Sequence, residues 1–253
     1  MAQPIKVHLT PPGPNPWKVV LVLQELGVPY EYHSFPFAEV KNKPYTDINP
    51  NGRVPAIEDP NTGVKIWETG AIILYLIEQY DTDHKISFPD LTNRSLCNQF
   101  LFFQVSGQGP YFGQAGWFNV LHSEKLQSAM DRYNAEVQRI LGVLEGLLSG
   151  KQWLVGDKMT YADLSFVTWN DRIDSLTMCA PDKKFVGFPG VQAWHERMTG
   201  RDAWKKCMED RDRLMDEQGL QSNGMPKGVN SMEEYEALIK AHNEAEAAKK
   251  AGK

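Results

Sequence analysis

Polar groups stand at the ends of predicted helices and strands in three short segments, of which Glu68-Thr69-Gly70 is the most informative. A nearly all-apolar stretch, 69–80, follows it and is expected to be a helix. The first N–H groups of a helix lack intrahelical partners and carry partial positive charge, so they favour a carboxylate, and the Thr69 hydroxyl adds a donor. Glu68 can accept an ammonium group. The segment predicts a receptor for the charged groups of an α-amino acid, or alternatively simple capping of the helix by Thr69.

The dipeptide Val54-Pro55 opens a predicted strand, 54–58, directly after the strong turn signal in 49–52. Proline has no N–H for a sheet ladder, so the start of a strand suits it, and X-Pro is the bond for which the cis form costs little. If this bond is cis, the N–H and C=O groups of Val54 are free to pair with an extended ligand as another strand would. The alternative is an ordinary trans proline at a sheet edge.

The third segment is the loop from Thr10 to Lys18, between a predicted strand and a predicted helix. Thr10 and Asn15 are the neutral donors in it. A thiol has a pKa of about 8.5, and hydrogen bonds with positive potential from a helix end lower that pKa and raise the thiolate fraction. No side chain in the loop is an obvious base. The alternative is a structural loop in which Asn15 caps the helix.

The elements that must position these residues follow from periodicity and turn chemistry. The helix after the loop repeats apolar residues from Val19 to Leu26, and Gly27 is suited to end it. The predicted order is strand, helix, strand, an irregular polar segment, two antiparallel strands and a helix, over 6–10, 19–26, 29–35, 38–52, 54–58, 64–67 and 69–80. A parallel crossover followed by a hairpin and a helix makes an α/β unit of about 80 residues.

Beyond a polar linker, 81–91, the sequence predicts helices and no convincing strand. Apolar residues in 126–148 step by threes and fours, and Thr160-x-x-Asp163 is typical of a capped helix start. We therefore expect an α/β domain over 1–83, an all-helical domain over 92–218 and a tail over 219–253. The tail contains a short helix starting near Ser231, or is disordered.

Composition excludes several classes of function. The formal net charge of −5 argues against a nucleic-acid partner. The longest apolar run, 71–77, is much shorter than the roughly 20 residues of a membrane helix, and the N-terminus carries no secretion signal, so we expect a cytoplasmic protein without a membrane partner. Three widely spaced cysteines, Cys97, Cys179 and Cys207, suggest reduced, mostly buried thiols and no metal site.

Taken together, Val54-Pro55, Glu68-Thr69-Gly70-Ala71 and the order of elements resemble a cytosolic glutathione transferase over about residues 5–215. The segments 13–19, 49–56 and 102–107 are similar to fungal members related to the yeast nitrogen-catabolite regulator that behaves as a prion. The resemblance implies a thioredoxin-like N-terminal domain and an all-α C-terminal domain. It also implies glutathione as cosubstrate and a homodimer.

The resemblance also implies roles for individual residues. Asn15, with Thr10, would face the sulfur of glutathione, Val54 and Pro55 would hold the cysteinyl backbone with help from Arg53, and Glu68 with Thr69 would hold the γ-glutamyl end. Asn15 would stabilise the thiolate by hydrogen bonding and not by removing a proton. The histidine often found in the loop near residue 40 is Val40 here, which leaves Lys41 or Lys43 as partners of the glycyl carboxylate.

A pocket for the second substrate is expected between the domains, in part along a loop-like segment, 107–116. Its expected walls are aromatic and polar side chains, which would suit a hydrophobic or aromatic electrophile, although core packing explains most of them equally well: Gln104, Tyr111, Phe112, Trp117, Trp169 and Arg172. Transfer of glutathione to such an electrophile, in detoxification or secondary metabolism, is the expected activity. The alternatives are a glutathione-dependent peroxidase and a regulatory protein that binds glutathione without turnover.

Overall fold

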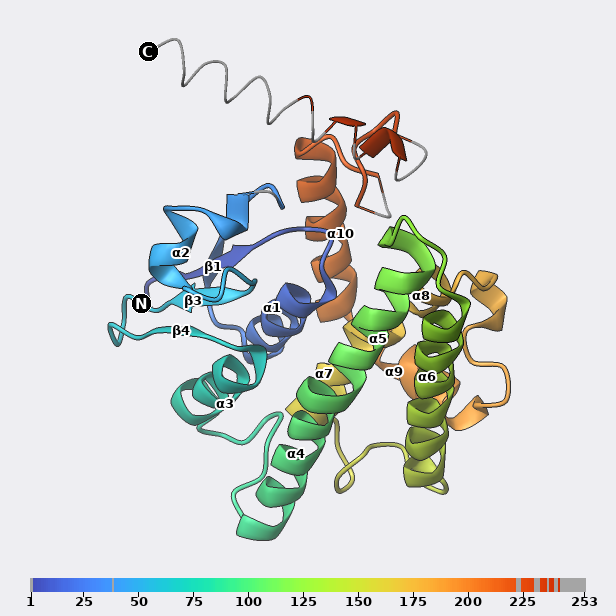
Figure 1. Cartoon of the computed structure of the whole chain (residues 1–253). Coiled ribbons are helices and arrows are strands. Elements are labelled where there is room, and N and C mark those ends of the chain that lie inside the picture. The colour runs from blue at the N-terminus through green and yellow to red at the C-terminus, as the bar shows by residue number, and fades with distance from the viewer. Residues whose placement is uncertain are drawn as a thin grey trace.

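A four-stranded mixed sheet forms the N-terminal part of the computed structural model, which describes residues 2–37, 39–221, 224–229, 233–235, 237–238 and 241 (Figure 1). The strands are β1 (Ile5–Leu9), β2 (Tyr30–Ser34), β3 (Ala56–Glu58) and β4 (Lys65–Trp67), in the spatial order β2-β1-β3-β4. β1 is parallel to β2 and antiparallel to β3, and β3 is antiparallel to β4. The predicted crossover and hairpin are confirmed.

Helices α1 (Pro14–Leu26) and α3 (Thr69–Tyr80) pack against each other and against the sheet. Gly27 ends α1 as predicted: its φ of 71° lies in the left-handed region, and its N–H bonds the carbonyls of Gln24 and Leu23. The segment predicted to be irregular contains a short 3-10 turn, η1 (Glu39–Lys41), and one helical turn, α2 (Tyr45–Ile48). Tyr45 packs on His8 of β1, which brings α2 against the sheet.

The rest of the described chain is helical, as predicted. Its elements are α4 (Leu91–Phe103), the π-helical turn η2 (Gln104–Gln108), α5 (Gly109–Gly116), the π-helical turn η3 (Trp117–Leu121), α6 (Gln127–Leu148), α7 (Tyr161–Asn170), α8 (Ile173–Thr177), η4 (Pro181–Lys183), α9 (Pro189–Thr199) and α10 (Asp202–Glu217). After β4, the only extended pairing among described residues is a bridge between Leu220 and Pro226. The helix expected from Ser231 onward lies mostly outside the described residues.

The expectation of a loop over residues 107–116 was wrong, because this segment is helical and continues α4 through η2 into α5. Its glycines serve close packing between helices. A Cβ on Gly116 would lie 2.5 Å from Cδ2 of Leu176, and one on Gly113 would lie 3.4 Å from the indole of Trp169. Small residues at these positions let α5 approach α7 and α8, so here glycine does not indicate a loop.

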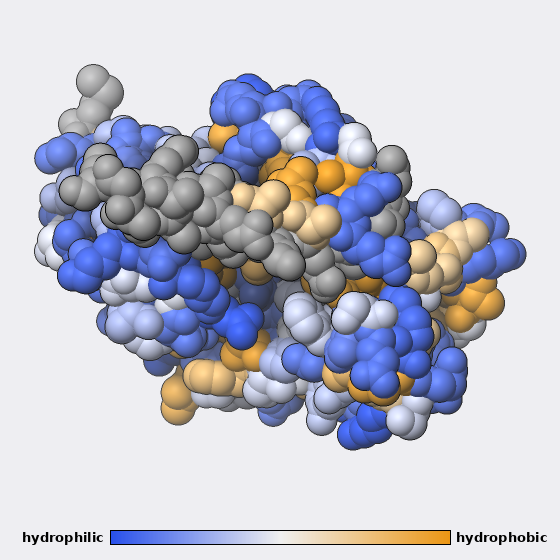
Figure 2. All heavy atoms as spheres, turned by 45° about the horizontal axis from the view of Figure 1, so that its top comes forward, coloured by the Kyte–Doolittle hydropathy of each residue, from blue (hydrophilic) through white to orange (hydrophobic). Residues whose placement is uncertain are grey.

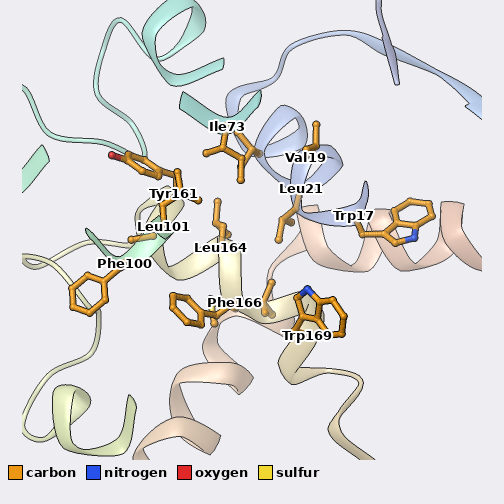
Figure 3. Packing of buried hydrophobic residues seen from close by; sticks show 14 of the residues in the cluster. Trp17, Val19, Leu21, Ile73, Phe100, Leu101, Tyr161, Leu164, Phe166 and Trp169 are labelled. Carbon is orange, nitrogen blue, oxygen red and sulfur yellow. The ribbon is translucent and has the colours of Figure 1, made fainter. Parts of the chain in front are cut away.

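One apolar cluster runs through both halves of the protein. In Figure 3, Leu21 of α1 lies near Leu164 of α7 and Ile73 of α3, whereas Val19 projects from another side of the same helix. The packing of α1 against both α3 and α7 holds the loop that precedes α1 between the sheet and the helical part.

The face shown in Figure 2 is largely hydrophilic, with scattered apolar residues and a hollow near its centre. In the described part of the chain, no helix is long and apolar enough to cross a membrane.

Candidate functional site

The register of the sheet brings the three predicted segments together at one end of β1, β3 and β4. Ala56 pairs with both His8 of β1 and Trp67 of β4. Ala56 is the first residue of β3, while β1 ends at Leu9 and β4 ends at Trp67, so the chain segments next to these three strand ends lie at the same end of the sheet. Segments 10–18, 54–55 and 68–70 thus share one edge of the sheet, as a common ligand would require.

At the Val54-Pro55 step the peptide bond is cis, which bears out the condition set by the sequence reasoning. The paired residues of β3 begin at Ala56, so Val54 lies outside the ladder and is half-buried. The turn before it is braced by two donors on the Arg53 carbonyl: the Tyr45 hydroxyl at 2.5 Å and the Asn49 amide nitrogen at 2.6 Å. This bracing fixes the backbone of Val54 for pairing with an extended ligand.

Three cations were predicted near this turn, and the structure separates them. Arg53 is exposed, and the side chain of Lys41 lies over the turn, since a Cβ on Gly52 would lie 3.1 Å from Lys41 Cδ. Lys43 instead forms an exposed ion pair with Asp47 at 3.0 Å. Of the two lysines, Lys41 thus lies next to the turn that precedes Val54, whereas Lys43 is paired elsewhere.

The N-terminus of α3 has unusual geometry. Glu68 is its N-cap residue, exposed, with φ 72° and ψ 117°, a backbone conformation unfavourable for a residue with a side chain. The capping alternative for Thr69 is wrong, because Thr69 is the first residue of the helix and no side chain caps it. Its hydroxyl accepts a hydrogen bond from Lys18 Nζ at 3.1 Å. Free N–H groups, an exposed carboxylate and an oriented hydroxyl thus meet at this helix end.

Asn15 occupies the second position of α1 and is half-buried, whereas Thr10, directly after β1, is 2% exposed. The capping alternative for Asn15 is also wrong, since the N-cap of α1 is Gly13 and no side chain caps the helix. The Asn15 Oδ1 atom accepts a hydrogen bond from Trp169 Nε1 at 2.9 Å. The loop itself is fixed by Trp17, whose indole donates to the Pro11 carbonyl at 2.9 Å.

Lys18 is a site residue that the sequence reasoning missed. It is 1% exposed, and its Nζ donates to Thr69 Oγ1 and, at 2.7 Å, to Gln104 Oε1. Burial lowers the pKa of Lys18 to about 7, while the nearby carboxylate of Glu68 opposes this shift. Lys18 lies three residues before Leu21 and four before Val22, and therefore on the same buried face of α1. This spacing was the signal that its side chain points inward.

A chain of buried amides leads from Lys18 into the helical part. Gln104 Nε2 donates to Gln108 Oε1 at 3.1 Å, and Gln108 Nε2 donates to Asn170 Oδ1 at 2.8 Å. All three side chains have no exposed surface. The network ties the N-terminus of α3 to η2 and α7.

The six residues predicted to line an acceptor pocket lie in different surroundings. Gln104 and Phe112 are fully buried in the core, and Trp169 is 7% exposed and bonded to Asn15. Tyr111 packs on Tyr133, and the 48% exposed Trp117 lies near His122.

Arg172 lines a small cavity that is formed by the loop before α1 and by residues of α7 and α10. None of the other five predicted pocket residues lines this cavity. The lining residues of this cavity are Pro12, Gly13, Pro14, Trp17, Thr168, Asp171, Arg172, Trp204, Met208 and Arg211.

The cysteines fit the expectation of reduced, mostly buried thiols: Cys97 and Cys207 are buried and Cys179 is half-buried. Burial raises the pKa of the Cys97 thiol to about 11 and that of the Cys207 thiol still further. Neither thiol is prepared to act as a nucleophile near neutral pH. Over the residues that the structure describes, no group of three His, Cys, Asp or Glu side chains could hold a metal ion.

Comparison with known proteins agrees with the resemblance to glutathione transferases found in the sequence. Family models for the N-terminal and C-terminal domains of glutathione S-transferase match residues 12–79 and 107–202. The "Glutathione S-transferase-like protein tpcF" of Aspergillus fumigatus is 45% identical over 217 residues, which cover 82% of this chain and 96% of that protein.

A crystal structure of the glutathione transferase URE2P8 from Phanerochaete chrysosporium with oxidized glutathione superposes with a TM-score of 0.80 at 40% identity, over 85% of this chain and 98% of that one. The "Transcriptional regulator URE2" of Saccharomyces cerevisiae is 35% identical over 234 residues, covering 78% of this chain and 65% of that protein. Both domain models match, and the similarity to tpcF extends over 96% of that protein. The chain therefore belongs to the glutathione transferase family, and its similar proteins include fungal Ure2-type members.

Proposed function

We propose that this protein transfers glutathione to a hydrophobic or aromatic electrophile. The observation that carries the proposal is that β1, β3 and β4 meet at Ala56, so that Thr10, the cis Val54-Pro55 step and the N-terminus of α3 all follow from the same end of the sheet. An unpaired backbone flanked by a helix N-terminus suits a ligand with a peptide backbone and a charged amino-acid end.

The proposed binding mode follows from this edge. The γ-glutamyl carboxylate takes the N–H groups of α3 and the Thr69 hydroxyl, and its ammonium group pairs with Glu68. The cysteinyl backbone pairs with Val54 beside Pro55, and the glycyl carboxylate approaches Lys41. The sulfur then lies at the loop before α1, near Thr10 and Asn15.

The proposed chemistry needs no base from the protein. Asn15 Nδ2 donates to the thiolate and favours it over the thiol, and the proton leaves to solvent. The thiolate attacks the electrophilic carbon, a carbon–sulfur bond forms, and the leaving group departs with the bonding electrons. Proximity and thiolate stabilisation supply the acceleration. We further propose that the protein acts in the cytoplasm as a homodimer.

Isothermal titration with glutathione, followed by turnover of 1-chloro-2,4-dinitrobenzene, tests the proposal. We expect binding in the millimolar range or tighter and measurable conjugation. Asn15→Ala should lower turnover while glutathione affinity stays within a few fold, since Asn15 meets only the sulfur. Absence of binding at millimolar glutathione would refute the function.

Glu68→Ala tests the role proposed for Glu68 in binding the γ-glutamyl end of glutathione, away from the reacting sulfur. We expect affinity to fall, by roughly 2 kcal/mol or more if the ammonium group is left buried and unpaired when its charged partner is removed. Glu78→Ala is the matched control, since Glu78 is an exposed glutamate near the opposite end of the same helix α3. Equal losses in both variants would contradict the assigned role of Glu68.

Reduction of peroxides is a second candidate, supported by the oxidized glutathione in the URE2P8 crystal structure. The same thiolate would attack a peroxide oxygen and break the O–O bond, which releases the alkoxide and leaves a sulfenic acid on glutathione. A second glutathione thiol would then displace water from that sulfur and form the disulfide. Turnover of cumene hydroperoxide without conjugation of aryl halides would favour it. A regulatory protein without turnover is the third candidate, supported by the likeness to the yeast regulator, and binding without either activity would favour that reading.

A further inference from the structure

The Asn15 side chain can help or hinder a thiolate, depending on which end of its amide faces the sulfur. The Nδ2 end carries two N–H donors, whereas the Oδ1 end presents lone pairs that repel a negative charge. Asn15 is half-buried at the start of α1, where both orientations fit the same space. Thiolate stabilisation therefore requires something that selects one orientation.

Trp169 makes this selection. Its indole Nε1 is a hydrogen-bond donor only and lies 2.9 Å from the Asn15 amide. The amide atom that faces it must be the acceptor Oδ1, because the opposite orientation would set two donors against each other. Nδ2 is then the end left for a ligand.

The indole of Trp169 is held in place by the helices around it. Trp169 is 7% exposed, and its ring meets that of Phe112 nearly at a right angle, 86°, with centroids 6.5 Å apart. A Cβ on Gly109 would lie 3.6 Å from Nε1, and one on Gly113 would lie 3.4 Å from the far edge of the ring. The two glycines of α5 thus make room for the indole in the orientation in which it bonds Asn15.

We propose that Trp169 is a positioning residue, whose N–H fixes the Asn15 amide so that Nδ2 donates to the thiolate of bound glutathione. This inference rests on the proposed glutathione site. It gives the helical domain a part in thiol activation, because α7 controls a donor carried by α1. It also gives Trp169 a different role from the pocket wall expected from the sequence.

Trp169→Phe tests the proposal, since it keeps an aromatic ring at this position and removes the N–H group together with part of the indole ring, a loss of volume that the control variant shares. The measurement is the pKa of the thiol of bound glutathione, followed by thiolate absorbance in the ultraviolet against pH. We expect this pKa to rise by about 1 unit, the effect of one lost hydrogen bond, with glutathione affinity at pH 6 within a few fold of wild type. Trp204→Phe is the matched control: Trp204 is also 7% exposed, and its ring contact is with His195. It should leave the thiol pKa unchanged.

A double-mutant cycle distinguishes positioning from general packing. In an Asn15→Ala background, Trp169→Phe should cause no further rise of the thiol pKa. An unchanged pKa in the single variant, or an equal rise with and without Asn15, would overturn the inference while leaving glutathione binding intact. Failure of the wild-type protein to bind glutathione would instead refute the proposed function.

Asn15→Asp gives a second test that does not depend on the folding of the Trp169 variant. One carboxylate oxygen would accept from Trp169, and the other would face the sulfur in place of Nδ2. The thiol pKa should then exceed that of Asn15→Ala. A value at or below that of Asn15→Ala would contradict the assigned orientation.

Discussion

Lys18 combines a positive charge with nearly complete burial, and its partners are neutral oxygens of Thr69 and Gln104. Neutral partners do not compensate the loss of water around an ammonium group, which is why burial lowers the pKa of Lys18 to about 7. The charge lies directly beneath the helix end proposed to take the γ-glutamyl carboxylate. We infer that the lysine lowers stability at acidic pH and strengthens anion binding at this helix end.

The stability cost has a measurable sign. An unfolded lysine has a pKa of 10.5, so between pH 7 and 10.5 the unfolded state binds one more proton than the folded state, and stability rises with pH. The free energy of unfolding should therefore rise by up to about 1.4 kcal/mol per pH unit above pH 7 in wild type relative to Lys18→Met. Urea denaturation at pH 7, 7.75 and 8.5 gives the difference, with Lys151→Met as a control at an exposed lysine. Parallel profiles for wild type and Lys18→Met would contradict the lowered pKa.

Local sequence signals predicted one part of the site and not the other. Glu68-Thr69 and Val54-Pro55 could be recognised because a turn, a strand start or a helix start lies beside each of them. The bonds of Lys18 to Thr69 and Gln104 span 51 and 86 residues, and the bond between Asn15 and Trp169 spans 154. Partners so distant along the chain are set by the packing of α1, η2 and α7, which periodicity does not reveal.

At the scale of elements, α7 shows how a capping signal becomes part of a core. The predicted capping box is confirmed: Thr160 Oγ1 accepts from Ala162 N–H, and Asp163 Oδ2 accepts from Thr160 N–H at 2.9 Å. Asp163 has no exposed surface, and its Oδ1 accepts from the N–H of Leu154 at 3.0 Å and from Trp194 Nε1 at 2.9 Å. One carboxylate thus starts α7 and ties it to the preceding loop and to α9.

Asp163→Ala should cost about 3 kcal/mol or more, because it removes a cap and leaves buried donors of Leu154 and Trp194 without acceptors. Asp90→Ala is the control. Asp90 is the exposed N-cap of α4 and accepts from Asn93 N–H at 2.9 Å, so its loss should cost only about 1 kcal/mol. Urea denaturation measures both, and similar losses would show that burial of the Asp163 network adds little.

Element prediction succeeded where a start or stop signal accompanied the periodicity. The helix predicted over 69–80 has those bounds, and the left-handed Gly27 ends α1. It failed over 107–116, where glycine serves contacts with Trp169 and Leu176 instead of a turn. The domain limits 1–83, 92–218 and 219–253 stay a prediction.

At the scale of the whole molecule, α1 is the element on which both halves depend. It packs on α3, α7 and α10. Glu25, near its end, is 4% exposed and receives two hydrogen bonds from Arg201 beside α10, at 2.6 Å from Nε and 2.8 Å from Nη2. Because the apolar cluster also crosses this boundary, we expect the two halves to unfold together.

The Glu25–Arg201 pair offers a test of this coupling. Arg201→Met leaves the buried carboxylate of Glu25 without the two guanidinium N–H donors that bond it. It should lower the free energy of unfolding by about 2 kcal/mol, a value reduced because the Arg201 side chain is 39% exposed to solvent. The double variant Glu25→Met/Arg201→Met removes the stranded charge and should recover part of that loss. Lys205→Met, which breaks the exposed pair with Asp202 on α10, should change stability by less than about 0.5 kcal/mol. Calorimetry should show a single unfolding transition in every variant. A separate transition at lower temperature in Arg201→Met would contradict this, because it would mean that the Glu25–Arg201 pair, instead of the shared apolar cluster, couples the unfolding of the two halves.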